Sequence, residues 1–190
     1  MKRSVLIILV AVVAVFVIGA SLAGTYNGLV TARENVDASF SGIATQLQRR
    51  LDLIPNLVNT VKGFAAQEKA VIDSVTEARS KLAGAASSGK VGEMAEADAG
   101  LSSALSRLLV VVENYPTLKS DANFRQLSDE LAGTENRIAV SRKDYNDTVR
   151  TYNTRIRRFP TNLIAGMFGF DAAEYFEASE NATEVPQVSF

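Results

Sequence analysis

The sequence predicts an all-α protein in which an N-terminal transmembrane helix is followed by an antiparallel four-helix bundle. Three observations support this prediction. Residues 5–23 form a continuous apolar run of membrane-spanning length. Apolar residues in most of the remaining chain recur at the three- and four-residue spacing typical of amphipathic helices. Residues 124–159 carry a heptad repeat, which is typical of helices packed lengthwise. We therefore expect an anchor at 1–25, a helical bundle at 26–178 and a disordered acidic tail at 179–190.

The composition excludes many familiar classes of active site. The 190 residues include no Cys and no His. The chain therefore has no disulfide, no thiolate nucleophile, no Ser-His-Asp triad and no imidazole or thiolate metal ligand. The net charge of −1 argues against nucleic-acid binding, which usually needs a basic surface. We expect no enzymatic activity, and therefore no catalytic, cofactor-binding or metal-binding residues.

The apolar run is best explained as a retained anchor. No charged residue occurs in residues 4–32, and residues 5–23 would span about 28 Å as a helix, close to the ~30 Å hydrocarbon core of a bilayer. A cleaved signal peptide is the alternative, because Lys2 and Arg3 precede the run and Ser21-Leu22-Ala23 resembles a cleavage site. The run is longer than the apolar core of a usual signal peptide, and a helical pattern resumes almost at once after it. These two features favour a single-pass anchor.

The charges flanking the anchor bear on its orientation. Lys2 and Arg3 precede the run, whereas the first basic residue after it is Arg33, which adjoins Glu34. The positive-inside rule then places the N-terminus in the cytoplasm and the domain outside.

Pro55 leaves two arrangements open for the domain. The chain either reverses there, which gives the four-helix bundle, or only kinks, which gives a long helical hairpin. The lack of glycine and turn residues around Pro55 favours a kink, but proline is also common in the first turn of a helix. We prefer a reversal, because a bundle buries the apolar stripes of four helices. Further breaks are predicted as a loop at 84–92 and at Pro116.

The heptad repeat in the predicted last helix indicates packing inside a bundle. The large residues at intervals of seven are Phe124, Leu131, Ile138, Tyr145, Tyr152 and Phe159. The matching second row is mostly small or polar: Leu127, Thr134, Ser141, Thr148 and Arg155. One large and one small row suit a multi-helix bundle better than a two-stranded coiled coil. The buried tyrosine hydroxyls need partners, and the neighbouring Asn146 and Asn153 are candidates.

The segment after Pro160 has two interpretations. It is apolar and contains glycine, and it comes after four arginines: Arg150, Arg155, Arg157 and Arg158. It either contacts the bilayer surface through these basic and apolar residues, or folds back over the end of the bundle with Asp171 and Glu174 neutralising the arginines. We prefer the second interpretation.

Several motifs along the chain are specific enough to indicate a family. They are Tyr26-Asn-x-Leu-Val30, Gln48-Arg-Arg-x-Asp-Leu-Ile-Pro-Asn-Leu-Val58, Glu113-x-Tyr-Pro-x-Leu-Lys119, Thr134-Glu-Asn-Arg-Ile-Ala139, Tyr145-Asn-x-x-Val-x-x-Tyr-Asn153 and Phe168-Gly-Phe170. In these motifs the chain resembles the LemA family. The resemblance implies a bacterial single-span protein with a four-helix bundle, no established enzymatic activity and no cofactor. A similar magnetosome protein is linked to membrane organisation, and some relatives are thought to have the N-terminus outside, which leaves the orientation open.

We therefore expect a membrane-anchored helical scaffold of the bacterial envelope. It would lie in the cytoplasmic membrane with its domain on the outer side. Its partners would be further copies of itself or another membrane protein, with no small-molecule substrate. One alternative is a transmembrane sensor or adaptor. A less favoured one is an enzyme using the carboxylates of Glu113 and Glu135 with Arg137.

Overall fold

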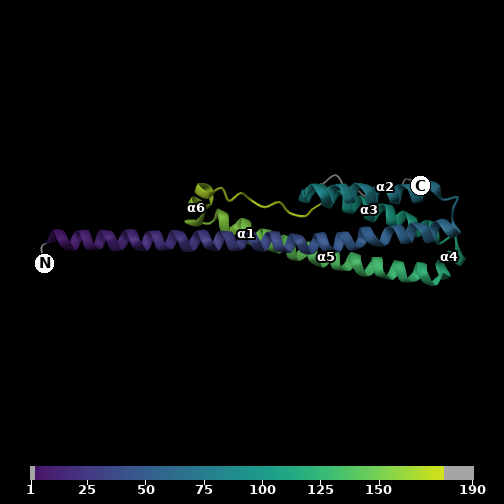
Figure 1. Cartoon of the computed structure of the whole chain (residues 1–190), viewed down its shortest axis with the longest axis horizontal. Helices are drawn as coiled ribbons and strands as arrows, with labels where there is room; N and C mark the ends of the chain where they lie inside the picture. Colours follow the sequence, from purple (N-terminus) through teal and green to yellow (C-terminus); the bar gives the residue numbers. More distant parts are fainter. Residues whose placement is uncertain (1–2, 178–190) are drawn as a thin grey trace, which may run out of the picture. The chain divides into compact units, whose positions relative to one another are not determined.

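The computed structural model describes residues 3–177, which form six helices and, in this range, no strand. The all-α prediction is therefore confirmed. The expected disordered tail at 179–190 lies outside the described residues. The helices are α1 (Arg3–Phe64), α2 (Lys69–Ser88), α3 (Val91–Val112), α4 (Pro116–Ser120), α5 (Ala122–Arg157) and α6 (Thr161–Phe168) (Figure 1).

The chain divides into two compact units. We call residues 1–38 with 147–173 the anchor unit, and residues 39–146 with 174–190 the bundle unit. Helices α1 and α5 each contribute residues to both units. The predicted boundaries of anchor, domain and tail remain a prediction.

The anchor unit contains the first part of α1, and there its apolar side chains are exposed. The large side chains from Leu6 to Leu22 are about half exposed or more. The most apolar 18-residue stretch of α1 has a mean hydropathy of 3.0. Among the described residues, α1 is the one helix long and apolar enough to cross a membrane. Further along, Leu29 and Val36 of α1 are buried, as are Tyr152 and Ile156 of α5.

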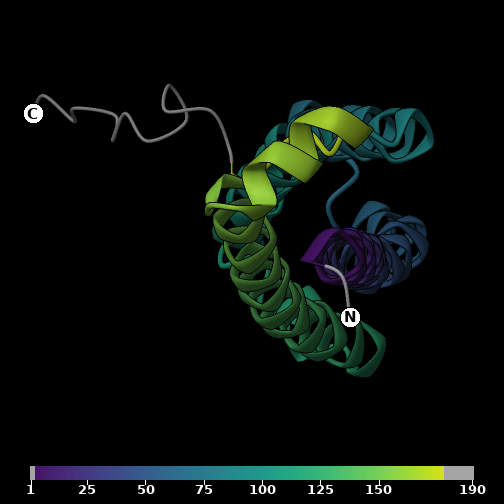
Figure 2. The same cartoon turned by 90° about the vertical axis from the view of Figure 1, so that its left-hand side faces the viewer.

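The bundle unit combines the later part of α1 with α2, α3 and the first part of α5. Helices α2 and α3 lie side by side as an antiparallel pair (Figures 1 and 2). The core is aliphatic, as the predicted stripes require. Its fully buried members include Ile43, Leu47, Ile54, Val61, Val75, Leu82, Leu101, Leu108 and Ile138.

The predicted reversal at Pro55 is wrong, because α1 continues through Pro55 to Phe64. Proline lacks an N–H, so the carbonyl of Leu51, four residues earlier, loses its helical donor. The guanidinium Nε of Arg79 on α2 donates to that carbonyl at 3.0 Å. A donor from the neighbouring helix thus replaces the missing bond and lets the helix tolerate its proline.

The chain reverses instead at residues 65–68. The side chains of this turn contact Tyr115, just before α4. The Tyr115 hydroxyl donates to Glu68 Oε1 at 2.7 Å and accepts from Gln67 Nε2 at 2.9 Å. The bond to Glu68 raises the pKa of the Tyr115 hydroxyl. The four-helix arrangement therefore stands, with its first turn displaced from Pro55.

The predicted loop at 84–92 is shorter than expected. Helix α2 continues to Ser88, and α3 begins at Val91. Gly89 ends α2 in the left-handed conformation at φ 69°, which glycine adopts without steric cost. Small residues such as Gly84 and Ala85 therefore belong to α2 and not to a loop.

The heptad row of α5 is buried over most of its length. Phe124, Ile138, Tyr145 and Tyr152 are buried, but Phe159 is 80% exposed and lies beyond the end of the helix. Toward the C-terminus the second buried row moves to Val149 and Ile156, four residues after the tyrosines. A straight helix drifts relative to a seven-residue repeat, which accounts for this change of row.

In the bundle unit, α5 holds part of the extended segment that comes after α6. The Tyr145 hydroxyl donates to the carbonyl of Glu174 at 2.8 Å. The side chain of Asn146 accepts from the backbone N–H of Phe176 at 2.9 Å and donates to its carbonyl at 3.4 Å. Together these bonds form a Tyr–Asn clamp on the segment.

The anchor unit contains a second clamp of the same kind. The Tyr152 hydroxyl donates to the carbonyl of Asp171 at 2.9 Å. Asn153 accepts from the N–H of Ala173 at 2.8 Å and donates to its carbonyl at 2.9 Å. Seven residues of helix and three residues of extended chain each advance about 10 Å, so a heptad on α5 matches three residues of the segment.

The expected role of the two asparagines is therefore corrected. Each hydroxyl bonds to a backbone carbonyl of the C-terminal segment, and the adjacent asparagine bonds to that same segment. A tyrosine hydroxyl projects well beyond the shorter asparagine side chain that follows it on the helix. The tyrosine and the asparagine of each clamp therefore bind different peptide groups of the C-terminal segment.

Candidate functional site

A charged cluster lies inside the bundle unit, where the sequence pattern predicted only helix packing. Arg50 of α1 is 4% exposed, and its Nη1 lies 2.6 Å from Oδ1 of Asp98 on α3. The same nitrogen lies 2.9 Å from Oε2 of Glu135 on α5, at ion-pair distance. Its Nη2 donates to Ser102 Oγ at 2.9 Å. Arg50 thus links three helices.

Arg142 of α5 completes the cluster. Its Nη2 donates to Glu135 Oε1 at 3.3 Å, and its Nη1 lies 3.8 Å from Asp98 Oδ2. The two arginines and two carboxylates sum to zero charge. Charges taken out of water are tolerated only when they are paired in this way.

Asp98 is the most deeply buried member of the cluster and is fully inaccessible to solvent. Burial raises the pKa of its carboxyl, and the charges of Arg50 and Arg142 oppose that rise. Its Oδ2 has no hydrogen-bond donor among the described residues. The carboxyl is closed to solvent, and the ion pairs of the cluster join α1, α3 and α5.

The carboxylates suggested for an enzyme are not brought together. Glu113 is exposed and pairs with Lys119 near α4, whereas Glu135 belongs to the buried cluster. Arg137 is exposed on α5 and lies beside Gly133. Within residues 3–177, no ion pair or hydrogen bond joins any two of these three. The geometry gives no support to paired-carboxylate chemistry at these positions.

Asp98 was not among the residues predicted to matter, although the sequence carried a signal for it. The apolar stripe of α3 includes Met94, Leu101 and Leu105, and Asp98 lies on that stripe, four residues after the first and three before the second. A carboxylate within an apolar stripe predicts a buried ion pair, because an unpaired one would be too costly. Its partner Arg50 is far away in sequence, so the pair itself was not predictable from spacing.

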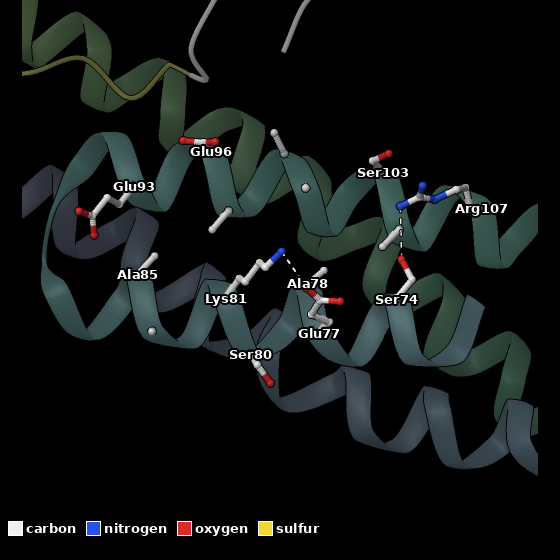
Figure 3. A pocket seen from close by; sticks show the side chains of 15 residues that line it. Ser74, Glu77, Ala78, Ser80, Lys81, Ala85, Glu93, Glu96, Ser103 and Arg107 are labelled. Carbon is white, nitrogen blue, oxygen red and sulfur yellow. Dashed lines mark hydrogen bonds and ion pairs between the residues drawn. The ribbon is translucent and has the colours of Figure 1, made fainter. Parts of the chain in front are cut away.

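An open groove between α2 and α3 is a candidate binding surface of the bundle unit (Figure 3). Its volume is about 750 Å³. The floor is formed by small side chains: Ala78, Gly84, Ala85, Ala97, Gly100 and Ala104. Charged residues of both signs surround it: Glu77, Lys81, Glu93, Glu96 and Arg107.

The groove has the features of a packing surface. Lys81 pairs with Glu77 at 2.9 Å, and Arg107 donates to Ser74 at 3.3 Å, so both basic side chains have partners within the groove lining (Figure 3). Cβ atoms added at Gly84 and Gly100 would meet no heavy atom within 4 Å. Small residues allow the backbone of another helix to approach closely.

Comparison with known proteins places these features in a family. The sequence profile of the LemA family matches residues 39–190. Magnetosome protein MamQ 2 of Paramagnetospirillum magneticum is 32% identical over 194 residues, covering 90% of this chain and 71% of the relative. Magnetosome protein MamQ of Magnetospirillum gryphiswaldense is 30% identical, covering 86% and 70%. Protein LemA of Metamycoplasma hominis is 26% identical over 157 residues, covering 83% and 71%. An all-helical domain behind an apolar N-terminal helix, together with this match over most of its length, shows that the chain belongs to the LemA family.

Proposed function

We propose that this protein is a membrane-anchored, non-catalytic assembly module of the bacterial envelope that associates with copies of itself. The observation that carries the proposal is the open groove between α2 and α3, which is lined largely by small side chains. Two relatives are named as magnetosome proteins, which supports a role at a membrane. We further propose that the anchor lies in the cytoplasmic membrane, and the positive-inside rule favours the domain on the outer side.

A second copy of the chain suits the groove because the charges around it are of both signs. Glu77 and Lys81 lie on α2, and Glu93, Glu96 and Arg107 lie on α3, so each helix carries charges of both signs. A surface that carries both signs can complement itself across a two-fold axis, as isologous dimers require. An anchor also confines the copies to one membrane, which raises their effective concentration.

The absence of Cys from the chain makes this proposal directly testable by cysteine crosslinking. Single cysteines would be placed on the groove floor by Gly84→Cys and Gly100→Cys, and on the exposed face of α5 by Val140→Cys as the matched control. Native membranes would then be treated with a short bifunctional thiol reagent. We expect crosslinked dimers for the two groove variants and few or none for the control.

A second substitution tests whether the groove itself makes the contact. Gly100→Trp fills the floor, so in a Gly84→Cys background it should abolish the crosslink while the protein remains folded. Monomers at every groove position, or equal crosslinking at Val140, would overturn the proposal. Labelling of the Val140→Cys variant, whose cysteine lies outside the groove, in intact cells by a membrane-impermeant maleimide tests the orientation, because a domain on the outer side is labelled without lysis.

A further inference from the structure

We infer that the C-terminal part of the anchor unit is a second membrane contact, which docks on the surface of an anionic bilayer beside the transmembrane helix. The inference extends the proposed function, because it relies on the anchor being in a membrane. It does not depend on self-association. It concerns α6, the arginines that precede it and the point at which α1 leaves its apolar run.

Ring contacts fix α6 next to α1. The ring of Tyr26 lies 4.9 Å from that of Phe168 and 5.7 Å from that of Phe170, measured between centroids. Tyr26 is three residues past Ala23, the last residue of the apolar run, or about 4.5 Å along the helix. Tyrosine at this position is typical of the level of the lipid headgroups. Helix α6 lies beside α1 at that level (Figure 1).

One face of α6 is buried and the other is apolar and exposed. Ile164 and Ala165 are buried, whereas Leu163 and Met167 are 62% and 75% exposed. Phe159, just before the helix, is 80% exposed. Residues 159, 163 and 167 are four apart, and the two within the helix lie on one side of it. Exposed apolar side chains beside a membrane-spanning helix suit the boundary between headgroups and acyl chains.

Three arginines that have no acidic partner among the described residues come shortly before or at the start of this apolar face. Within residues 3–177, no carboxylate lies at ion-pair distance from Arg155, Arg157 or Arg158. The Arg155 guanidinium rests on α1 at Gly28, where an added Cβ would lie 2.1 Å from Nη2. It therefore lies close to the level of Tyr26. Arginines near the surface of an anionic membrane are attracted to it.

An open hollow beside α6 suits a phosphate headgroup. Its volume is about 570 Å³, and Arg150, Arg155, Arg158 and the hydroxyl-bearing Thr151, Thr154 and Thr161 line it. Arg150 already pairs with Asp147 at 2.9 Å, whereas the other two arginines have no acidic partner in the described chain. Guanidinium groups and hydroxyls are the side chains that bind phosphate oxygens.

The expectation that Asp171 and Glu174 neutralise these arginines receives no support from the contacts. The carbonyl of Asp171 accepts from Tyr152, while Glu174 directs Oε1 toward Gly92, where an added Cβ would lie 2.6 Å away. The segment does fold back, because one face of α6 is buried and the chain after it is bonded to α5 by the two clamps. The cations are left for another partner, and their position beside the anchor favours lipid.

The absence of Trp from the chain provides a probe for this contact. The full chain carrying Met167→Trp would be reconstituted in vesicles of brominated phosphatidylcholine with and without phosphatidylglycerol. We expect blue-shifted emission and quenching by the bromines, increased by the anionic lipid. Val110→Trp is the matched control, because Val110 is 71% exposed in the bundle unit, and its emission should remain that of a tryptophan in water. Leu163→Trp provides a second probe should the first variant fold poorly.

The arginines are tested in the Met167→Trp background by Arg155→Gln, Arg157→Gln and Arg158→Gln together. Each charge near an anionic surface contributes about fivefold to the docking equilibrium, so the increase caused by phosphatidylglycerol should disappear. The matched control combines Arg107→Gln, Arg125→Gln and Arg137→Gln in the bundle unit. It should leave the increase caused by phosphatidylglycerol unchanged.

Water-like, unquenched emission at both positions 163 and 167 would overturn the inference. So would a blue shift that increases with protein density but shows no bromine quenching, because that result assigns the face to a protein contact. Crosslinking through Gly84→Cys and Gly100→Cys is measured separately, so failure of docking and failure of self-association are distinguishable.

Discussion

The two units of this protein differ in the exposure of their apolar side chains and in the pairing of their charged ones. The anchor unit exposes large apolar residues from Leu6 to Leu22 and again at Phe159 and Met167, and it leaves arginines without acidic partners in the described chain. The bundle unit buries its apolar stripes and encloses Arg50 with Asp98. The difference indicates that the surroundings differ, with lipid favouring exposed apolar groups and water favouring buried ones.

The two units share one structural feature, the Tyr–Asn clamp. A Tyr–Asn clamp on the C-terminal segment occurs once in each unit, at Tyr145 and at Tyr152. Both rings are almost fully buried, at 2% and 1% exposure. The same local device therefore operates in both units, and the differences lie in the surfaces around it.

The largest effect is expected from breaking the buried ion pair. Asp98→Ala leaves Arg50 buried without its closest carboxylate, and removal of one partner of such a pair typically costs about 3–5 kcal/mol in the free energy of unfolding. The measurement is denaturant unfolding of the full chain in micelles, followed by circular dichroism. Glu96→Ala, at an exposed position on the same helix, is the control and should change stability by less than about 0.5 kcal/mol. If Asp98→Ala and Glu96→Ala lowered the free energy of unfolding equally, the cluster would be solvated.

The same cluster predicts a pH dependence with a definite sign. Burial raises the pKa of Asp98 above its ordinary value of 3.8, so the folded state holds this proton to higher pH than the unfolded state does. The contribution of Asp98 to stability is full below the ordinary pKa and is lost as the pH rises through the raised one. Asp98→Asn should remove this part of the pH dependence. An unchanged profile would contradict the raised pKa.

An intermediate effect is expected from the clamps. Tyr145→Phe and Tyr152→Phe each leave a backbone carbonyl without its donor, which costs about 1–2 kcal/mol in the free energy of unfolding. Hydrogen exchange at the N–H of Phe176 should accelerate most in the Tyr145 variant, and exchange at Ala173 most in the Tyr152 variant. Phe40→Leu, which alters a ring contact of Tyr145 but no clamp bond, is the control. If exchange accelerated at both Phe176 and Ala173 in every variant, the two clamps would open cooperatively and not independently.

The smallest effect concerns the donor that compensates for Pro55. Arg79→Met removes the bond to the Leu51 carbonyl and should cost about 1 kcal/mol. In a Pro55→Ala background the helix supplies its own N–H to that carbonyl, so the same change should cost less than half as much. The double-mutant cycle measures this coupling directly. Additive effects would mean that Arg79 contributes only through packing.

Particular residues show how far the sequence could predict the fold. The apolar run at 5–23 is a local pattern that predicted its helix correctly. The stripes and the row through Ile138, Tyr145 and Tyr152 are also local, and they predicted buried helix faces correctly. Pro55 was misassigned, because its tolerance within α1 depends on Arg79, a residue distant in sequence. The seam was extended too far at Phe159, since the end of a helix depends partly on the packing of the next segment of the chain.

The sequence by itself determined that the chain is mostly helical, which helix is apolar enough for a membrane, and that histidine and cysteine chemistry is absent, because these properties depend on composition and on period. Only the tertiary structure decided where the chain reverses, which carboxylate meets Arg50 and which carbonyls accept from Tyr145 and Tyr152. The physical reason is that these bonds join groups that are far apart in sequence. A buried polar group must find a partner, but its own periodicity does not say which one.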